Sequence, residues 1–260
     1  MNLPHIFFVF CAAALVLYGA FLGIVALFKN AVIFPAPPPS YSRAQMFLPL
    51  ANGERVAAVW LPADSEAPVI LYSHGNGEDL GEIAEVLRTL NSRGFSVLAY
   101  DYVGYGLSEG KPSEEKIYMA ADAAWKWLAE TMKIPAGRIA LMGYSLGSAA
   151  ASHLAAAHPD ARCLVLSGAF SDGVNAVCPV RIVPMSILDN ASKLAGVRMP
   201  TLVLHGTRDF VVPPRNARKI FGLLPSPNKR LVWFEGAGHA LPQVENYFDE
   251  VCAFVNNPRP

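Results

Sequence analysis

Hydrophobic positions along this chain follow two different patterns, and the first is confined to the N-terminus. Residues 6–28 (IFFVFCAAALVLYGAFLGIVALF) are continuously apolar and carry no charged side chain. A helix rises about 1.5 Å per residue, so this stretch is long enough to cross a hydrocarbon layer of about 30 Å. We therefore predict a single membrane-spanning anchor in residues 1–30, followed in residues 31–42 by a proline-rich spacer (FPAPPPS).

Beyond the spacer, short apolar runs alternate with helical patterns. Residues 43–50 and 54–61 flank Asn52-Gly53, which is the usual signal of a β-hairpin. Further strands are predicted at 68–73, 95–100, 138–143, 163–168, 201–206 and 230–236, and helices at 80–93, 114–132, 146–157, 214–223 and 242–255. Runs of Val, Leu and Ile are typical of strands that helices cover on both faces. We expect one α/β domain over residues 43–260 with an eight-stranded, mostly parallel sheet.

Charge and composition exclude some classes of partner. The 21 basic and 21 acidic side chains balance, and no basic cluster is present, so we do not expect a nucleic-acid partner. The sequence has no H-E-x-x-H motif and no cysteine pair at metal-binding spacing, so no metal or other cofactor is expected. We expect the cysteines to be buried thiols. They are Cys11, Cys163, Cys178 and Cys252.

A G-x-S-x-G motif, Gly143 to Gly147, lies directly between a predicted strand (RIALMG) and an alanine-rich predicted helix (SAAASHLAAA). This context suits a nucleophilic serine, which must occupy a strained turn from strand to helix that accepts only small residues two positions to either side. We therefore predict Ser145 as a nucleophile rather than an ordinary loop serine.

A serine hydroxyl needs a base to accept its proton and an acid to orient that base. Among the six histidines, His239 is the candidate base, because it lies in a glycine-rich loop (EGAGHA) after the last predicted strand. Asp209, in HGTRDFVVP after the preceding strand, is the candidate acid, and the order serine, aspartate, histidine is usual for such sites. Asp172 is an alternative acid, although a turn-capping role is the simpler interpretation for it.

The loop SHGNG after the strand at 68–73 is expected to supply part of an oxyanion hole. We predict the backbone N–H groups of Asn76 and Leu146 as its two donors, and His74 as a residue that holds the loop. The glycine-rich segment at 101–110 (DYVGYGLSEG) lacks the G-K-[ST] of a phosphate-binding loop and is interpreted as scaffold beside the pocket.

Together the segments LYSHGNGEDLG, AYDYVGYGLSEGKPSEE, LMGYSLGSAA, LHGTRDFVVP and EGAGH resemble the α/β-hydrolase superfamily. From about residue 45 onward the similarity is to a branch of membrane-associated single-domain hydrolases that includes eukaryotic protein depalmitoylases. The resemblance implies an ester or thioester hydrolase that needs no cofactor, with Ser145, Asp209 and His239 as its triad. Those depalmitoylases carry a cysteine-rich, acylated N-terminus, whereas this chain has an apolar stretch with only Cys11, so the substrate need not be shared.

Two alternative functions remain open. Proline-specific aminopeptidases of the same superfamily usually carry a larger helical cap with acidic residues, whereas residues 169–200 form a short cap region whose only acids are Asp172 and Asp189. This difference favours ester bonds, in a small-molecule or lipidated acyl substrate, over peptides. A non-catalytic binding protein on the same fold is the other alternative, because fold alone does not guarantee activity.

Charges near the apolar stretch bear on the side of the membrane. Lys29 and Arg43 follow the stretch, whereas only His5 and the amino terminus precede it. Positive residues tend to stay in the cytoplasm, so we expect the catalytic domain on the cytoplasmic side. A cleaved secretory signal is the alternative, but residues 1–5 contain no Lys or Arg, as such signals usually do.

Overall fold

The computed structural model describes residues 3–173, 176 and 186–258, and its contacts divide the chain into two compact units, Met1–Pro35 and Ala36–Pro260. The first unit is helix α1 (Leu3–Ile33). Within it, Phe7–Leu27 has a mean hydropathy of 2.5, and none of that window is buried. By length and composition this helix is able to cross a membrane.

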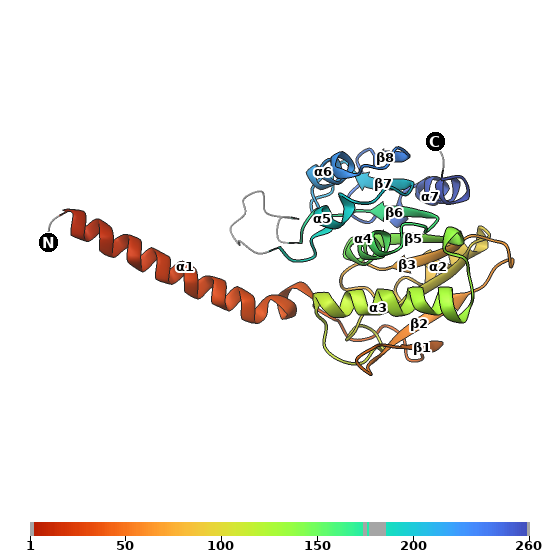
Figure 1. Cartoon of the computed structure of the whole chain (residues 1–260), viewed down its shortest axis with the longest axis horizontal. Coiled ribbons are helices and arrows are strands. Elements are labelled where there is room, and N and C mark those ends of the chain that lie inside the picture. The colour runs from red at the N-terminus through yellow and green to blue at the C-terminus, as the bar shows by residue number, and fades with distance from the viewer. Residues whose placement is uncertain (1–2, 174–175, 177–185, 259–260) are drawn as a thin grey trace. The chain divides into compact units, whose positions relative to one another are not determined.

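The second unit contains an eight-stranded sheet in the order β1-β2-β4-β3-β5-β6-β7-β8 (Figure 1). The strands are β1 (Met46–Pro49), β2 (Arg55–Leu61), β3 (Val69–Ser73), β4 (Ser96–Tyr100), β5 (Ile139–Tyr144), β6 (Cys163–Ser167), β7 (Thr201–Gly206) and β8 (Lys229–Phe234). Strand β2 pairs antiparallel with both β1 and β4, and every other pairing is parallel. The predicted fold class, an eight-stranded and mostly parallel sheet, is therefore confirmed.

Helices cover the sheet as the continuous apolar strands require. They are α2 (Ala84–Ser92), α3 (Glu114–Lys126), α4 (Gly147–Ala157), α5 (Asn190–Leu194), α6 (Arg215–Leu223) and α7 (Tyr247–Asn256). Side chains of β3, β4 and β5 form a buried core with α2 and α7. Helices α3, α4, α5 and α6 contact one another in series.

Three helical regions differ from the sequence prediction. Helix α3 ends in a π-helical turn (Trp127–Thr131). The helix predicted from residue 242 begins only at Tyr247, because Leu241–Gln243 is a 3-10 turn and Asn246 is left-handed with φ +63°. The stretch at 169–200, predicted only as a short cap region, contains helix α5. Asp189 caps the N-terminus of this helix by accepting a hydrogen bond from the Ser192 N–H at 3.1 Å. Five residues are too few to show helical periodicity in a sequence.

The cysteines fall in different environments. Cys163 and Cys252 are buried free thiols, whereas Cys11 in α1 is only partly buried, so the expectation of a buried thiol does not hold for it. An apolar helix with little else packed around it leaves its side chains exposed. The same expectation for Cys178 lies outside the described residues.

We predict that Leu98→Ala lowers the free energy of unfolding by about 2–5 kcal/mol, because Leu98 is fully buried in β4 and the shorter side chain leaves a cavity. Leu223→Ala, at a side chain that is 38% exposed at the end of α6, is the matched control and should change it by less than about 1 kcal/mol. Chemical denaturation of both variants measures the difference. Equal losses would contradict this account of the core.

Candidate active site

The turn from β5 to α4 is tight and strained at Ser145. This residue has φ +50°, a left-handed conformation that non-glycine residues rarely adopt, and its N–H donates to the Ser167 carbonyl at 2.9 Å. A Cβ added to Gly143 would lie 2.3 Å from the Gly147 carbonyl oxygen. A Cβ added to Gly147 would lie 1.9 Å from the Ser73 carbonyl oxygen. Both motif glycines are therefore steric requirements, as the G-x-S-x-G pattern predicts.

The structure brings the three predicted triad residues together. His239 Nε2 lies 2.9 Å from Ser145 Oγ, and His239 Nδ1 lies 2.7 Å from Asp209 Oδ2. The other carboxylate oxygen of Asp209 accepts the N–H groups of Val211 and Val212 at 2.9 and 2.8 Å. With its orientation fixed by two backbone donors, Asp209 holds the imidazole so that Nε2 faces the serine.

Hydrogen bonding keeps Asp209 ionised despite its burial. Burial alone raises the pKa of this carboxyl, but the hydrogen bonds from His239 and from the Val212 N–H lower the pKa by more, and the net shift is downward. A second buried histidine, His205, lies 3.5 Å from the same carboxylate and bonds through Nε2 to the Val212 carbonyl at 2.7 Å. Burial lowers the pKa of His205, which favours the neutral ring.

The alternative acid, Asp172, is buried near the end of β6. Both ring nitrogens of His239 are already engaged, one with Ser145 and the other with Asp209. The geometry therefore favours Asp209 as the acid that orients the histidine.

The predicted oxyanion loop follows β3 and packs directly against the serine turn. A Cβ on Gly147 would also lie only 2.7 Å from the His74 carbonyl oxygen, so the two segments touch through backbone atoms. Within the loop, the Tyr105 hydroxyl donates to Asn76 Oδ1 at 2.7 Å. Leu146 directly precedes α4 and therefore lies at the N-terminal end of this helix. The backbone N–H groups at that end have no acceptor within the helix. Both predicted donors thus lie on segments that meet beside Ser145.

A buried carboxylate, Asp101, supports this loop from behind. Its Oδ1 accepts the Leu80 N–H at 2.9 Å and lies 3.3 Å from His74 Nε2, an ion-pair contact that is not a well-aligned hydrogen bond. His74 Nδ1 bonds to the Gly75 carbonyl at 2.8 Å. Because Nδ1 donates there, Nε2 carries a proton only in the charged ring, the form that the carboxylate favours.

The charge state of His74 follows from two opposing effects. Burial lowers the pKa of His74, but Asp101 and the Gly75 carbonyl raise it by more, and the net shift is upward. His74 thus holds the loop, in the role that the sequence suggested for it. The sequence predicts Asp101 only as part of a scaffold segment, although an aspartate directly after a strand and ahead of closely spaced glycines is a usable signal.

Two residues of the predicted spacer form hydrogen bonds with buried carboxylates of the folded unit. The Tyr41 hydroxyl donates to Asp101 Oδ2, and the Leu107 N–H donates to the Tyr41 hydroxyl at 3.2 Å. The Ser40 N–H donates to Asp79 Oδ2 at 2.6 Å, and the Ser40 hydroxyl donates to the other oxygen of that carboxylate. Residues 31–42 therefore do not form a uniform linker, because their last part is bonded into the folded unit.

Solved structures with the same fold place the chain in a class. A monoacylglycerol lipase of Paleococcus ferrophilus aligns with a TM-score of 0.61 at 22% identity, over 78% of this chain and 98% of the lipase. A Pyrococcus furiosus esterase aligns with a TM-score of 0.68 at 18% identity, over 84% of this chain and 92% of the esterase. These likenesses, together with the sheet order, show the α/β-hydrolase fold.

Sequence comparisons then identify the family. The family model described as serine aminopeptidase, S33, matches residues 64–195 and 185–245, so the chain belongs to this family of the α/β-hydrolase superfamily. An uncharacterized protein of Mycobacterium tuberculosis is 32% identical over 246 residues, which cover 89% of this chain and 87% of that protein. The prediction of a serine hydrolase is confirmed at the level of the family.

A human relative, alpha/beta hydrolase domain-containing protein 17B, is 31% identical over 193 residues. The match covers 73% of this chain but 66%, just under two thirds, of the human protein. This relative supports the predicted superfamily branch.

We predict that Asp79→Asn destabilises the protein by about 1–3 kcal/mol at pH 7, because charged acceptors hold their hydrogen bonds more strongly. Burial raises the pKa of Asp79, but hydrogen bonds from Ser40, Gly81 and Glu82 lower it by more, so its folded pKa lies below the ordinary value of 3.8. The contribution is therefore complete above that value and disappears as the pH falls through the folded pKa.

Unfolding free energies of wild type and Asp79→Asn, measured from pH 7 down to pH 3, test this expectation. The difference should be constant in the upper part of the range and should shrink below about pH 4. Exposed Asp160 supplies the matched control, and Asp160→Asn should change stability by less than about 0.5 kcal/mol at any pH. A pH-independent effect of Asp79→Asn would show that its charge does not matter.

Proposed function

We propose that this protein is a membrane-anchored serine hydrolase that cleaves carboxylic ester or thioester bonds through an acyl-enzyme intermediate. One observation carries the proposal: the hydrogen-bonded series from Ser145 Oγ to His239 and on to buried Asp209, at 2.9 and 2.7 Å. These are the distances at which a base accepts a proton from a nucleophile, and the acid behind it favours the charged imidazolium.

In the first half of the reaction, Ser145 Oγ attacks the acyl carbon and its proton passes to His239 Nε2. The bond from carbon to the leaving oxygen or sulfur then breaks, and the leaving group takes that proton. In the second half, a water molecule loses a proton to the same nitrogen and attacks the acyl-serine carbon. The acid is released, and the proton returns to Ser145.

Negative charge develops on the carbonyl oxygen at both tetrahedral stages. The proposed donors are the N–H groups of Asn76 and Leu146, and one such donor typically contributes about 2.7–4 kcal/mol to the transition state. Rigid donors matter more than strong ones, because they need no reorganisation as charge develops. The hydrogen bonds that the Tyr105 hydroxyl donates to Asn76 and the Leu80 N–H donates to Asp101 support this rigidity.

Esters and thioesters fit the chain better than peptides do, for two reasons. Solved neighbours with the same fold are a monoacylglycerol lipase and esterases, among them the esterase domain of a Rhodothermus marinus protein at 25% identity and a TM-score of 0.60. The segment at 169–200, where cap domains are inserted in related peptidases, is short. A substrate with a lipid acyl group is consistent with the neighbouring lipase and with a chain that carries its own apolar helix.

A second candidate, hydrolysis of peptides at their amino terminus, is favoured by the name of the family, serine aminopeptidase. Both candidates use the same nucleophile. They differ in the bond cleaved, so hydrolysis of p-nitrophenyl butyrate against that of aminoacyl p-nitroanilides separates them.

Apolar helix α1 supports the anchoring part of the proposal. The window Phe7–Leu27 is not buried in the structure, which argues against a core helix of a soluble fold. Retention of Met1 in the mature chain would argue against a cleaved signal. The side on which the catalytic unit lies is proposed to be cytoplasmic, from Lys29 and Arg43.

We predict that Ser145→Ala abolishes p-nitrophenyl butyrate hydrolysis and labelling by a fluorophosphonate, with a fall in kcat on the order of 10⁵–10⁶ and little change in melting temperature. Asp209→Asn should lower kcat by about 10⁴, because the wrong tautomer of His239 is then favoured. The other acid provides the control, and Asp172→Asn should retain most activity. Mass spectrometry of the labelled wild-type chain should locate the adduct on Ser145.

Three results would contradict parts of this assignment. Full activity of Ser145→Ala would remove the nucleophile. Wild-type activity of Asp209→Asn with an inactive Asp172→Asn would transfer the role of the acid. No adduct on folded wild-type protein would favour a binding protein that has kept the fold.

We predict that the intact chain, including Met1, stays in the membrane fraction after carbonate extraction. The double variant Leu15→Arg/Val16→Arg should release it or prevent insertion, because a central arginine costs about 2.5–3.5 kcal/mol in an apolar helix. Leu27→Arg, at the end of the same window, is the matched control and should be retained, because arginine at a helix end reaches the interface. A mature chain that begins near residue 20 or 30 would contradict the anchor.

A further inference from the structure

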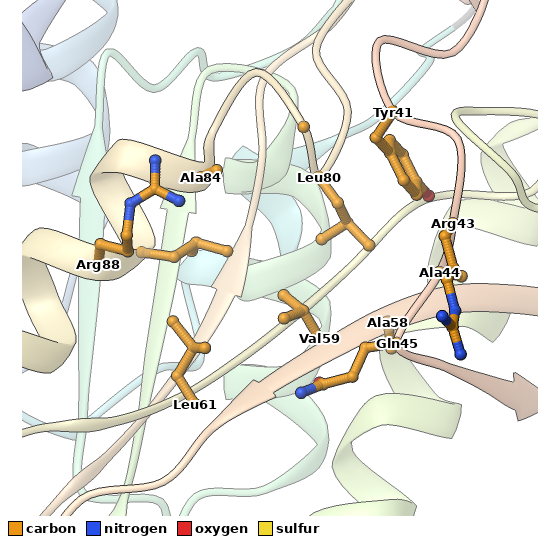
Figure 2. A pocket seen from close by; sticks show the side chains of 12 residues that line it. Tyr41, Arg43, Ala44, Gln45, Ala58, Val59, Leu61, Leu80, Ala84 and Arg88 are labelled. Carbon is orange, nitrogen blue, oxygen red and sulfur yellow. The ribbon is translucent and has the colours of Figure 1, made fainter.

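An apolar groove lies beside strand β2, apart from the predicted triad and its oxyanion loop (Figure 2). Its volume is about 260 Å³. Three short segments line it: residues 41–45, residues 58–61 of β2, and residues 80–88, which include the start of α2. None of the lining residues is proposed above to take part in the reaction.

The floor of the groove is an uncovered continuation of the main core. Val59 and Leu61 are two positions apart on β2, so they face the same side of the sheet, and both remain partly exposed. Leu80, Ala84 and Leu87 form the opposite wall. The core that α2 and α7 complete over the central strands thus remains partly open beside β2, which lies between β1 and β4 in the sheet.

Two arginines border this apolar surface, and Figure 2 shows them on opposite sides of it. Arg88 pairs with Glu85 on the exposed face of α2. Arg43 is exposed and has no ion pair or side-chain hydrogen bond among the described residues. An apolar floor with an unpaired cation at its edge is complementary to a molecule that has a hydrocarbon chain and an anionic head.

The size of the groove limits the hydrocarbon part. Pockets for drug-sized ligands usually measure about 300–1,000 Å³, and this groove is slightly smaller. It therefore suits one alkyl chain better than the two chains of a phospholipid. Tyr41 is the first residue along the chain that lines the groove, and it follows the end of α1 at Ile33 by eight residues. Eight residues of extended chain span at most about 29 Å. If α1 spans a bilayer, lipids are close enough to supply the occupant.

We propose that this groove binds a long-chain fatty acid, with its alkyl chain on Val59, Leu61, Leu80 and Leu87 and its carboxylate at Arg43. The groove shares no residue with the proposed triad, although Tyr41 and Leu80, which line it, also bond to Asp101. An uncharged alcohol of the same chain length fills the apolar part but gains nothing from Arg43.

The test uses the full-length chain in lipid nanodiscs and a palmitate that carries a diazirine in its alkyl chain. After irradiation, mass spectrometry should locate adducts within residues 41–45, 58–61 and 80–88. Unlabelled palmitate should compete for these adducts better than hexadecanol does. Adducts found only in Leu3–Ile33, or only around Ser145, would overturn the proposal, as would equal competition by the alcohol.

Two pairs of variants separate the groove from general lipid contact. Ala84→Phe places a ring in the groove and should reduce its adducts to background, whereas Ala156→Phe, on the exposed face of α4, should not. Arg43→Gln should lower the apparent affinity by about two- to fivefold, as expected for an exposed charge pair, and Arg198→Gln at another exposed arginine should leave it unchanged. Thermal unfolding confirms that each variant is folded, and wild-type adduct yield in folded Ala84→Phe would refute the groove.

Discussion

The close approach of two loops, one after β3 and one after β5, is the constraint on which the rest of the site depends. Gly147 lies so near the Ser73 carbonyl that no side chain fits between them. This approach requires β3 and β5 to be parallel neighbours, and they pair from Val69 with Ile139 to Ser73 with Gly143. The strained Ser145 is held at the meeting point, where the proposed nucleophile and the two proposed backbone donors face the same space.

A second requirement is that the loop after β3 keep its shape although it has no regular structure. Its backbone is held by side chains from distant parts of the chain, with Asp101 at the centre. That carboxylate is fully buried, and Gly106 is needed beside it, because a Cβ there would lie 1.8 Å from Asp101 Oδ2. Tyr41 and His74 contact the same carboxylate, and both precede Asp101 in the chain. A buried charge of this kind is tolerated only because each of its oxygens has a partner.

These two features explain what the sequence was able to predict. The sheet and the serine turn depend on local patterns: apolar runs of strand length, and small residues two positions from Ser145. The support around Asp101 depends on contacts between residues up to 60 positions apart, and no local pattern specifies them. The start of α7 was misplaced for a different reason, because a left-handed Asn246 interrupts an otherwise helical apolar pattern. The proposed triad residues can be identified from the sequence, because their chain order and their positions after strands are themselves sequence features.

The same long-range contacts change the meaning of the segment between α1 and the sheet. A flexible tether would leave the folded unit free of its anchor, but Ser40 and Tyr41 are bonded to Asp79 and Asp101. The backbone of Ala36 is also hydrogen-bonded to Tyr105, and proline restricts the backbone from Phe34 to Pro39 further. The end of the segment that follows the apolar helix is therefore bonded to two carboxylates that lie beside the predicted oxyanion loop.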